Sequence, residues 1–516
     1  MPSPSNASPD TAATVSPAAP AAHRRVMFWV ALLYFSEGLP LGLFYDLFPV
    51  HMRQAGIGPA EIGLLSLLGL AWTVKFLWAP LVDTRRGHRW WIAGANWGMA
   101  LVLFTFALNP QALGPGASWP WALLAAFTVL SATNDIATDG YTIELLAKGL
   151  YGVANGLRIG FYRVGMLTAG ALLMVAGAFG SDGQANWAAA YGVGGVVMLL
   201  NGMGLLMAPA QPARVKPTRT APSGEWAIVR QQPIWILALG LVMVGLLWPV
   251  LGPLSKVAGW DAIKAISGTW WFKGAIPVGL MFIGASLVVV AARNPKAQAL
   301  ADGPVFGAWV GMLSRPGMLG VLGFILLYKL GDTAIGFMIK PFWVDAGFTP
   351  AQIGMVSVNV GLGLSILGGL AGGWYVDRVG IFKGLWVFGL AQASSNLAYA
   401  IAAWYVPQGA GASPVAWQYQ MTVYTASGLE SITQGLGTGA FMAFLMSITN
   451  KERATTEYAI LSSIFAFSRS VAGWAGGLGV EHLGYPAFFF MTVVLCFPAY
   501  LLLPAVRRML DKAEAR

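Results

Sequence analysis

The sequence predicts an all-α membrane protein that crosses the bilayer many times. Of its 516 residues, 57% are hydrophobic and only 10% are charged, whereas soluble domains carry about 25% charged residues. The 65 glycines and 30 prolines agree with this class, because both residue types are commoner in transmembrane helices than in soluble ones. A soluble protein is therefore excluded. A lipid-spanning β-barrel is disfavoured, since its strands would appear as short alternating segments.

The first 25 residues are expected to form a disordered cytoplasmic tail. The first 22 are rich in Pro, Ser, Ala and Thr and carry a single charge, Asp10, so they cannot bury enough apolar surface to fold. The apolar run that follows Arg25 is long enough to span a bilayer. Because no basic segment precedes a short apolar core with a small-residue cleavage site, we expect an uncleaved first helix rather than a signal peptide.

Apolar runs of spanning length recur along the rest of the chain, and each predicts one helix. They cover residues 26–48, 60–81, 90–109, 120–147, 153–178, 187–209, 233–252, 271–292, 317–340, 351–375, 383–404, 419–447, 455–478 and 485–506. About 14 helices place both termini on the same side of the membrane. Most Lys and Arg residues of the connections fall on that side, so the positive-inside rule predicts that both termini are cytoplasmic.

Polar markers that repeat about 300 positions apart predict two equivalent halves of six helices each. Four pairs, spaced by 294 to 306 positions, occur in the same order: Tyr34 and Tyr328, Asp83 and Asp377, Asn134 and Gln434, and Arg163 and Arg469. Chance similarity among Gly-rich helices is the alternative. The predicted domains are a tail (1–25), an N-terminal six-helix half (26–210), a cytoplasmic linker with an inserted two-helix hairpin (211–316), a C-terminal six-helix half (317–506) and a cytoplasmic tail (507–516).

Ionisable residues inside the predicted helices mark the candidate site, because a charge at mid-bilayer costs about 3 kcal/mol or more. A buried carboxylate can take up a proton, and a buried cation can hold an anionic substrate. Structural pairs that only join helices are the alternative. Lys329 and Asp332 are three apart and can pair, and we expect Arg163 to be the nearest strong cation to Asp135 or Asp139. The predicted substrate and proton pathway comprises Glu37, Lys75, Asp135, Asp139, Arg163, Lys329, Asp332, Glu430, Gln434 and Arg469.

Charged residues at the predicted cytoplasmic helix ends are candidates for gating, since a carboxylate and an arginine can clamp neighbouring helices. They are Asp83, Arg85, Asp377 and Arg378. Catalytic and cofactor chemistry is not indicated. The four histidines are scattered, Cys496 is the single cysteine, and no GxxxxGK[ST] loop is present, so we expect no metal site, catalytic triad, cofactor or ATP-driven pump. The net charge of +10 is attributed to membrane orientation rather than to nucleic-acid binding.

Several motifs resemble those of the AmpG-type muropeptide permeases of the major facilitator superfamily. They are SEGLPLGL at 36–43, KFLWAPLVD at 75–83, NDIATDGY at 134–141, YRVGM at 162–166, LYKLGD at 327–332, SSNLAY at 394–399 and GLGTGAFMAFLM at 435–446. The resemblance extends over nearly all of residues 26–506, and more distantly to acetyl-CoA transporters. The polar residues that match the family's positions are Lys75, Asp83, Asp135, Asp139, Arg163, Lys329, Asp332, Glu430 and Arg469. The departures from the family's pattern are Glu37, Asp46, Glu144 and the long central hairpin.

The resemblance implies a major facilitator fold in the inner membrane and proton-driven import of anhydro-muropeptides. These are GlcNAc-anhydroMurNAc with or without its peptide, moved from periplasm to cytoplasm for cell-wall recycling. A permease for another anionic metabolite, such as acetyl-CoA or a sugar acid, is the alternative within transport. A membrane-embedded enzyme and a non-transporting sensor are alternatives from other classes. The hairpin is expected to serve stability or partner contact.

Overall fold

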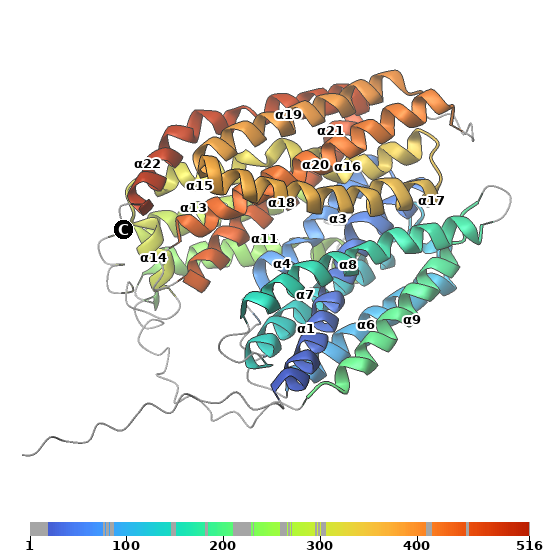
Figure 1. Ribbon diagram of the computed structural model, residues 1–516, viewed down its shortest axis with the longest axis horizontal. Coiled ribbons are helices and arrows are strands. Elements are labelled where there is room, and N and C mark those ends of the chain that lie inside the picture. Colours follow the sequence, from blue (N-terminus) through green and yellow to red (C-terminus); the bar gives the residue numbers. More distant parts are fainter. Residues whose placement is uncertain are drawn as a thin grey trace, which may run out of the picture.

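Every regular element that the structure describes is a helix, as Figure 1 shows. This computed structural model describes residues 19–75, 78, 82, 87–145, 151–180, 184–209, 229–230, 232–258, 266, 269, 271–294, 297, 300, 306–408, 415–449 and 454–514. The helices lie side by side in one elongated bundle. The predicted all-α class is confirmed.

Seven helical runs are long and apolar enough to cross a membrane, judged by length and composition. They are Arg24–Gln54, His88–Leu108, Leu157–Ala178, Trp187–Leu206, Met318–Asp345, Pro350–Val379 and Ile460–Lys512. The last run holds two crossings, because the chain reverses at Gly484, where a φ of 74° suits glycine. With the shorter and more polar helices, the elements make up the fourteen crossings that the sequence predicts.

The first six crossings form one group of packed helices. They are built by α1 (Ala19–Gly42), η1 (Leu43–Leu47), α2 (Phe48–Gln54), α3 (Pro59–Leu68), α4 (Leu70–Val74), α6 (His88–Leu108), α7 (Trp119–Leu145), α8 (Tyr151–Ala178) and α9 (Trp187–Leu206). Helix α1 packs closely on α8, because a Cβ at Gly38 would lie 1.9 Å from the carbonyl oxygen of Tyr162. This approach brings the polar residues of α1 beside those of α8.

The last six crossings form a second group. They are built by α15 (Met318–Tyr328), α16 (Leu330–Asp345), α17 (Pro350–Gln352), η6 (Ile353–Val360), α18 (Gly361–Val379), α19 (Ile381–Tyr405), α20 (Trp417–Ser447), α21 (Ala454–Leu495), η8 (Pro498–Leu502) and α22 (Leu503–Glu514). The first crossing of this group is broken at Lys329, whose φ of −103° and ψ of 10° are not helical. Two groups of six crossings match the predicted pseudo-repeats of the major facilitator fold.

Two further helices lie between the groups in sequence. They are α11 (Pro233–Ala258) and α13 (Ile276–Ala292), with η4 (Trp271–Ala275) before α13. The two helices pack on each other. Met281 of α13 lies in one apolar cluster with Leu67 and Leu70 of the first half and Trp474 of the second. The inserted hairpin therefore contacts both halves.

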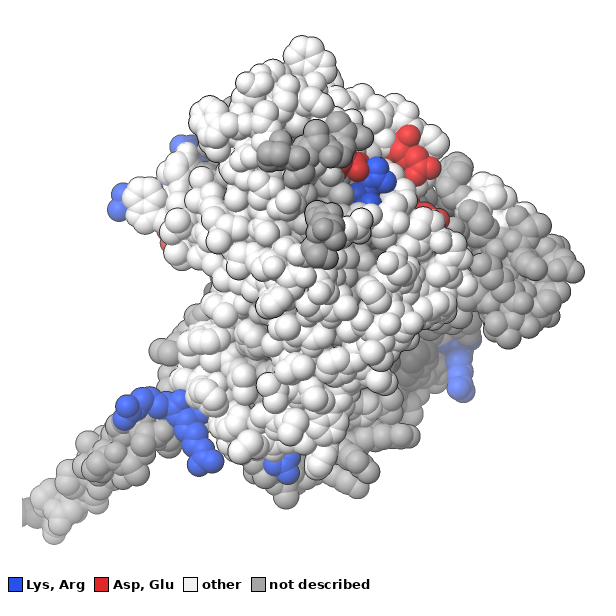
Figure 2. Space-filling model, turned by 90° about the vertical axis from the view of Figure 1, so that its right-hand side faces the viewer, with Lys and Arg blue, Asp and Glu red and all other residues white. Residues whose placement is uncertain are grey.

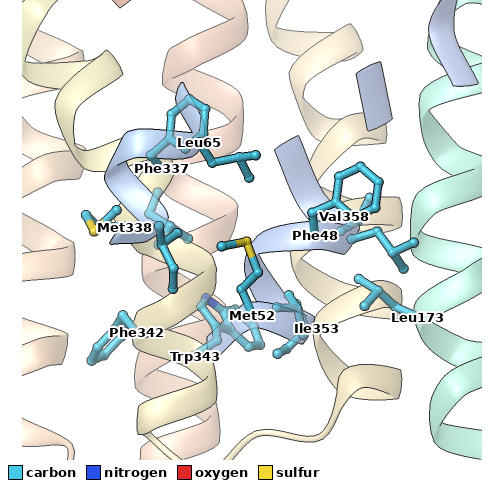
Figure 3. Packing of buried hydrophobic residues seen from close by; sticks show 14 of the residues in the cluster. Phe48, Met52, Leu65, Leu173, Phe337, Met338, Phe342, Trp343, Ile353 and Val358 are labelled. Atoms are coloured by element: carbon cyan, nitrogen blue, oxygen red, sulfur yellow. The ribbon is translucent and has the colours of Figure 1, made fainter. Parts of the chain in front are cut away.

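The two halves are joined at the end of the bundle opposite to the termini, here termed the far end. Helix α2 packs on α16, α3 packs on α21, and α8 packs on α17 and η6. Figure 3 shows the apolar cluster at this junction, where Phe48 and Met52 of the first half lie among Phe337, Trp343 and Ile353 of the second. The far end is closed by packed side chains.

The outer surface carries wide uncharged areas, as expected for a protein surrounded by lipid. Figure 2 shows one face, which is mostly uncharged; acidic and basic side chains lie together at one place on it, and further basic side chains are scattered near its edges. Large apolar side chains such as Leu101, Leu370 and Trp404 are exposed. Such surface is stable in contact with acyl chains.

Candidate functional site

Charged side chains of the first half converge between α1, α4, α7 and α8. We term Tyr34, Glu37, Lys75, Asp135, Asp139 and Arg158 the N-half cluster. The Lys75 ammonium is ion-paired with Asp135. The Asp139 Oδ1 accepts hydrogen bonds from the Tyr34 hydroxyl at 2.7 Å and from Arg158 Nη2 at 2.9 Å. Helical spacing explains the shared direction of the two aspartates, since residues four apart lie on one face.

The two aspartates of the N-half cluster differ in access to solvent. The side chain of Asp135 is 11% exposed, whereas that of Asp139 is 39% exposed and that of its partner Arg158 is 38% exposed. Asp135 is therefore the inner carboxylate and Asp139 the outer one. A proton that reaches the cluster from water meets Asp139 first.

Glu37 brings a third carboxyl group into the N-half cluster. The charges of Asp135 and Asp139 act on it, and its Oε2 is buried without a hydrogen-bond partner. Ionised carboxylates that lie close together repel one another, and a proton bound to one of them removes that repulsion. Three carboxyl groups face two cations, so the fully ionised cluster carries one uncompensated negative charge.

The expectation that Arg163 is the nearest strong cation to these aspartates is wrong. Lys75 forms an ion pair with Asp135, and Arg158 forms one with Asp139. Arg158 and Arg163 are five positions apart on α8 and therefore point in different directions from the helix axis. Sequence reasoning missed Arg158 because an arginine near a helix start resembles an orientation signal.

In the second half, Lys329 and Asp332 form the ion pair that their spacing predicts. Lys329 Nζ lies 3.1 Å from Asp332 Oδ2 and donates to Thr438 Oγ1 at 2.9 Å. Both side chains of the pair are 4% exposed. Gln392 Nε2 also donates to Asp332 Oδ2, at 3.4 Å. The break between α15 and α16 falls at Lys329 and turns its side chain toward α20.

Glu430 and Gln434 lie on α20, one turn apart. Glu430 is buried, and the Ser431 hydroxyl donates to its Oε2 at 3.4 Å. Gln434 is half-buried. The charges of Asp332, Lys329 and Lys340 act on Glu430, so this carboxyl group lies near the second half's own ion pair rather than near the N-half cluster.

The two predicted arginines reach across the junction of the halves. Arg163 Nη1 of α8 donates to the Ser365 hydroxyl of α18 at 3.4 Å. The Arg469 guanidinium of α21 lies 3.9 Å from the centre of the Tyr45 ring in η1. Both side chains are half-buried. Each half thus presents one arginine to the other.

Two of the four predicted gating residues lie in the described chain, at the end of α18. Asp377 and Arg378 are exposed at the end of α18, and the Arg378 guanidinium lies 4.1 Å from the centre of the Trp374 ring. Asp83 and Arg85 lie outside the described residues. A gating role for these four residues remains a prediction.

Two ion pairs at the far end were not anticipated, and they join the halves directly. Arg53 Nε lies 2.7 Å from Asp345 Oδ1, and Lys340 Nζ lies 3.4 Å from Asp46 Oδ1. The Tyr485 hydroxyl donates to Asp345 Oδ2 at 2.7 Å. The repeat spacing contained the signal, since Asp46 and Lys340 are 294 positions apart and occupy equivalent positions with opposite charges. We term the two ion pairs the far-end pairs.

Comparison with known proteins confirms the resemblance to AmpG-type permeases. The chain is 26% identical over 489 residues to the anhydromuropeptide permease of Escherichia coli strain K12, which covers 93% of this chain and 79% of that protein. It is 24% identical over 486 residues to the putative transporter AmpG 4 of Rickettsia conorii, covering 92% and 95% of the two chains. No family model matches the chain.

Solved transporter structures share the fold. An autoinhibited peptide transporter of the POT family aligns with a TM-score of 0.64 at 15% identity, over 95% of this chain and 96% of that one. The POT family transporter PepTSo aligns with a TM-score of 0.62 at 14% identity, over 96% and 99%. A bacterial homologue of the lysosomal transporter Spinster, in an inward-facing and occupied conformation, aligns at 0.57 and 12% identity over 97% and 99%. These structures show the shared fold, and together with the relatives named permease and transporter they support a multi-pass membrane transporter for a small molecule.

Proposed function

We propose that this transporter imports anhydro-muropeptides from periplasm to cytoplasm together with protons. Its substrate is GlcNAc-anhydroMurNAc with or without the peptide. The name of the E. coli relative, at 26% identity over 93% of this chain, supports this substrate class. The protein lies in the inner membrane with both termini in the cytoplasm, in agreement with the positive-inside rule.

The N-half cluster is the observation that supports proton coupling. Three carboxyl groups, Glu37, Asp135 and Asp139, face the two cations Lys75 and Arg158. Binding one proton makes the cluster neutral, and losing it leaves an uncompensated charge inside the membrane, which is costly. Because Asp139 is the most exposed of the ion-paired carboxylates, it is the group through which the proton enters and leaves.

Alternating access follows from the way the halves are joined. The halves, 26–210 and 317–506, rock against each other around a site near mid-membrane, while the linker 211–316 spans between them. The structure is closed at the far end by the far-end pairs and the apolar cluster. Opening toward the periplasm therefore requires that Arg53 separates from Asp345 and that Lys340 separates from Asp46.

Substrate competition tests this assignment. The measurement is uptake of labelled GlcNAc-anhydroMurNAc into right-side-out vesicles, with unlabelled muropeptide, acetyl-CoA or a simple sugar acid as competitor. We expect competition by muropeptides alone. Equal competition by acetyl-CoA or the sugar acid would favour a permease for another anionic metabolite. The matched control is Arg507→Gln, which changes an exposed arginine of α22 whose guanidinium lies 5.6 Å from the centre of the Phe382 ring of α19, away from the proposed path.

A further inference from the structure

We propose that Arg163 and Arg469 together form a carboxylate-binding site that is shared between the two halves. This inference rests on the proposed function, because it assigns the ligand group that the site takes from the transported molecule. The two arginines are 306 positions apart and occupy equivalent places in the pseudo-repeat. Each extends from its own half to a residue of the other, Ser365 or Tyr45.

Neither contact neutralises the arginine's charge. The hydrogen bond from Arg163 goes to a neutral hydroxyl at 3.4 Å, which is long for such a bond. Arg469 lies over an aromatic ring, which attracts a cation by about 0.5–2 kcal/mol without supplying a counter-charge. In the part of the chain that the structure describes, neither arginine forms an ion pair with an acidic side chain.

The carboxylates that form ion pairs in the described chain already have cationic partners of their own, and the charges that act on Arg163 do not include those of Glu37 or Glu430, which form no described ion pair. In the first half, Asp135 pairs with Lys75 and Asp139 pairs with Arg158. The four remaining ion pairs of the described chain follow the same one-to-one scheme: Asp46 with Lys340, Asp332 with Lys329, Asp345 with Arg53, and Glu457 with Arg315. The two arginines are thus left as a surplus of positive charge at the junction.

The positive charges of the two arginines also act on each other. Both charges also act on Tyr162 of α8, so the two guanidinium groups lie within reach of one another. Two half-buried like charges without counter-ions destabilise the site. A bound anion removes this cost, and guanidinium groups bind carboxylates with two parallel hydrogen bonds. A carboxylate held by both arginines would also bridge the halves and couple substrate binding to their closure.

Chemical modification of the wild-type protein tests the anion site without any substitution. In nanodiscs, phenylglyoxal labelling of Arg163 and Arg469 is followed by peptide mass spectrometry with lactate, lactamide or GlcNAc-anhydroMurNAc present. We expect lactate and GlcNAc-anhydroMurNAc, each at about nine times its Kd, to slow labelling of both arginines about tenfold, because the free fraction falls by the factor 1 + [L]/Kd. Neutral lactamide should have no effect, and labelling of Arg507 should be unchanged throughout.

The outcomes separate this inference from the proposed function. Protection by lactate but not by GlcNAc-anhydroMurNAc would support the anion site and contradict the muropeptide assignment. Equal protection by lactate and lactamide, or no protection by either acid, would overturn the anion site whatever the transport result. Protection of only one of the two arginines would overturn the shared site.

A binding comparison gives a second, independent readout. GlcNAc-anhydroMurNAc and its neutral carboxamide are titrated against the wild-type protein and Arg163→Gln, Arg469→Gln and Arg507→Gln. We expect the wild type and Arg507→Gln to prefer the acid by about tenfold, and the first two variants to lose that preference while they bind the carboxamide as the wild type does. An undiminished preference in both variants would contradict the site.

Discussion

The N-half cluster and the Lys329–Asp332 pair occupy related regions of the two halves, yet they differ in charge balance and in access. Tyr34 and Tyr328 are repeat equivalents, but the Tyr34 hydroxyl donates to the Asp139 carboxylate, whereas the Tyr328 hydroxyl donates to the Leu385 carbonyl oxygen. The N-half cluster has more carboxyl groups than cations and is open at Asp139. The Lys329–Asp332 pair is balanced one to one and shielded from water, and the buried Glu430 lies near it without an ion pair in the described chain.

This difference indicates that the two structurally equivalent halves have different roles. A carboxyl group in excess of its cations, and reachable by water, can bind and release a proton during each transport cycle. A balanced ion pair shielded from water resists titration, because removing either charge leaves the other buried and unpaired. We therefore expect the first half to couple protons and the second half to provide a fixed structural pair.

The largest effect is expected from Asp332→Asn, which tests whether the Lys329–Asp332 pair is structural. The substitution leaves Lys329 buried without its carboxylate, so the free energy of unfolding should fall by about 3–5 kcal/mol. Thermal unfolding of the purified protein in detergent measures this loss. Replacing both residues, as in Lys329→Met with Asp332→Leu, should restore most of the stability. Wild-type stability with lost transport in Asp332→Asn would show that the pair belongs to the transport path.

The substitution Arg158→Gln tests whether the N-half cluster binds the coupled proton. Removing this cation leaves three carboxyl groups with Lys75 alone, which favours their protonated state. The pH of half-maximal uptake should therefore move upward by about one unit. Uptake rates measured between pH 5 and 9 provide the readout, with Arg507→Gln as the matched control. A pH profile that coincides with that of the wild type would separate Arg158 from the proton site.

The far-end pairs test whether the two halves move as units. Arg53→Gln removes a half-buried ion pair with Asp345, worth about 1 kcal/mol, and should raise the population open at the far end about fivefold. Spin-label distances between the ends of α2 and α16 report this population. Arg507→Gln, at an exposed position of α22, is the control. Unchanged distances in Arg53→Gln would mean that the pair does not hold the far end closed.

The smallest effect is expected from deleting the inserted hairpin, residues 230–296. The deletion uncovers Leu67, Leu70 and Trp474, but acyl chains can replace the lost contacts because lipid is as apolar as these side chains. Transport should persist, and the free energy of unfolding should fall by less than about 1 kcal/mol. Lost transport in a well-expressed and inserted deletion protein would assign the hairpin to the mechanism.

Local spacing in the sequence predicted some contacts of the site. The other contacts depend on how distant helices pack and could be seen only in the structure. Lys329 and Asp332 pair as their three-residue spacing predicts, because one helical turn fixes their distance. Arg158 could not be paired with Asp139 from the sequence, since the contact depends on how α7 and α8 pack. The apolar runs predicted the crossings for the same local reason, as each run needs only its own length.

The far-end pairs depend on the fold, but the repeat in the sequence also contains a signal for them. Arg53 and Asp345 are 292 positions apart, close to the repeat spacing that the sequence reveals. In a fold with two related halves, the equivalent first helices of each half meet near the pseudo-symmetry axis. Opposite charges at equivalent positions of these helices are therefore a sequence signal for a contact between halves.

The most direct test of proton coupling by the N-half cluster is uptake by Asp139→Asn. Labelled GlcNAc-anhydroMurNAc is supplied to right-side-out vesicles with and without an inward proton gradient, alongside the wild type. We expect the gradient to drive accumulation in the wild type alone, while the variant retains its fold because this carboxylate is 39% exposed and such pairs contribute about 1 kcal/mol or less. Accumulation by Asp139→Asn that still follows the gradient at the wild-type level would contradict the account.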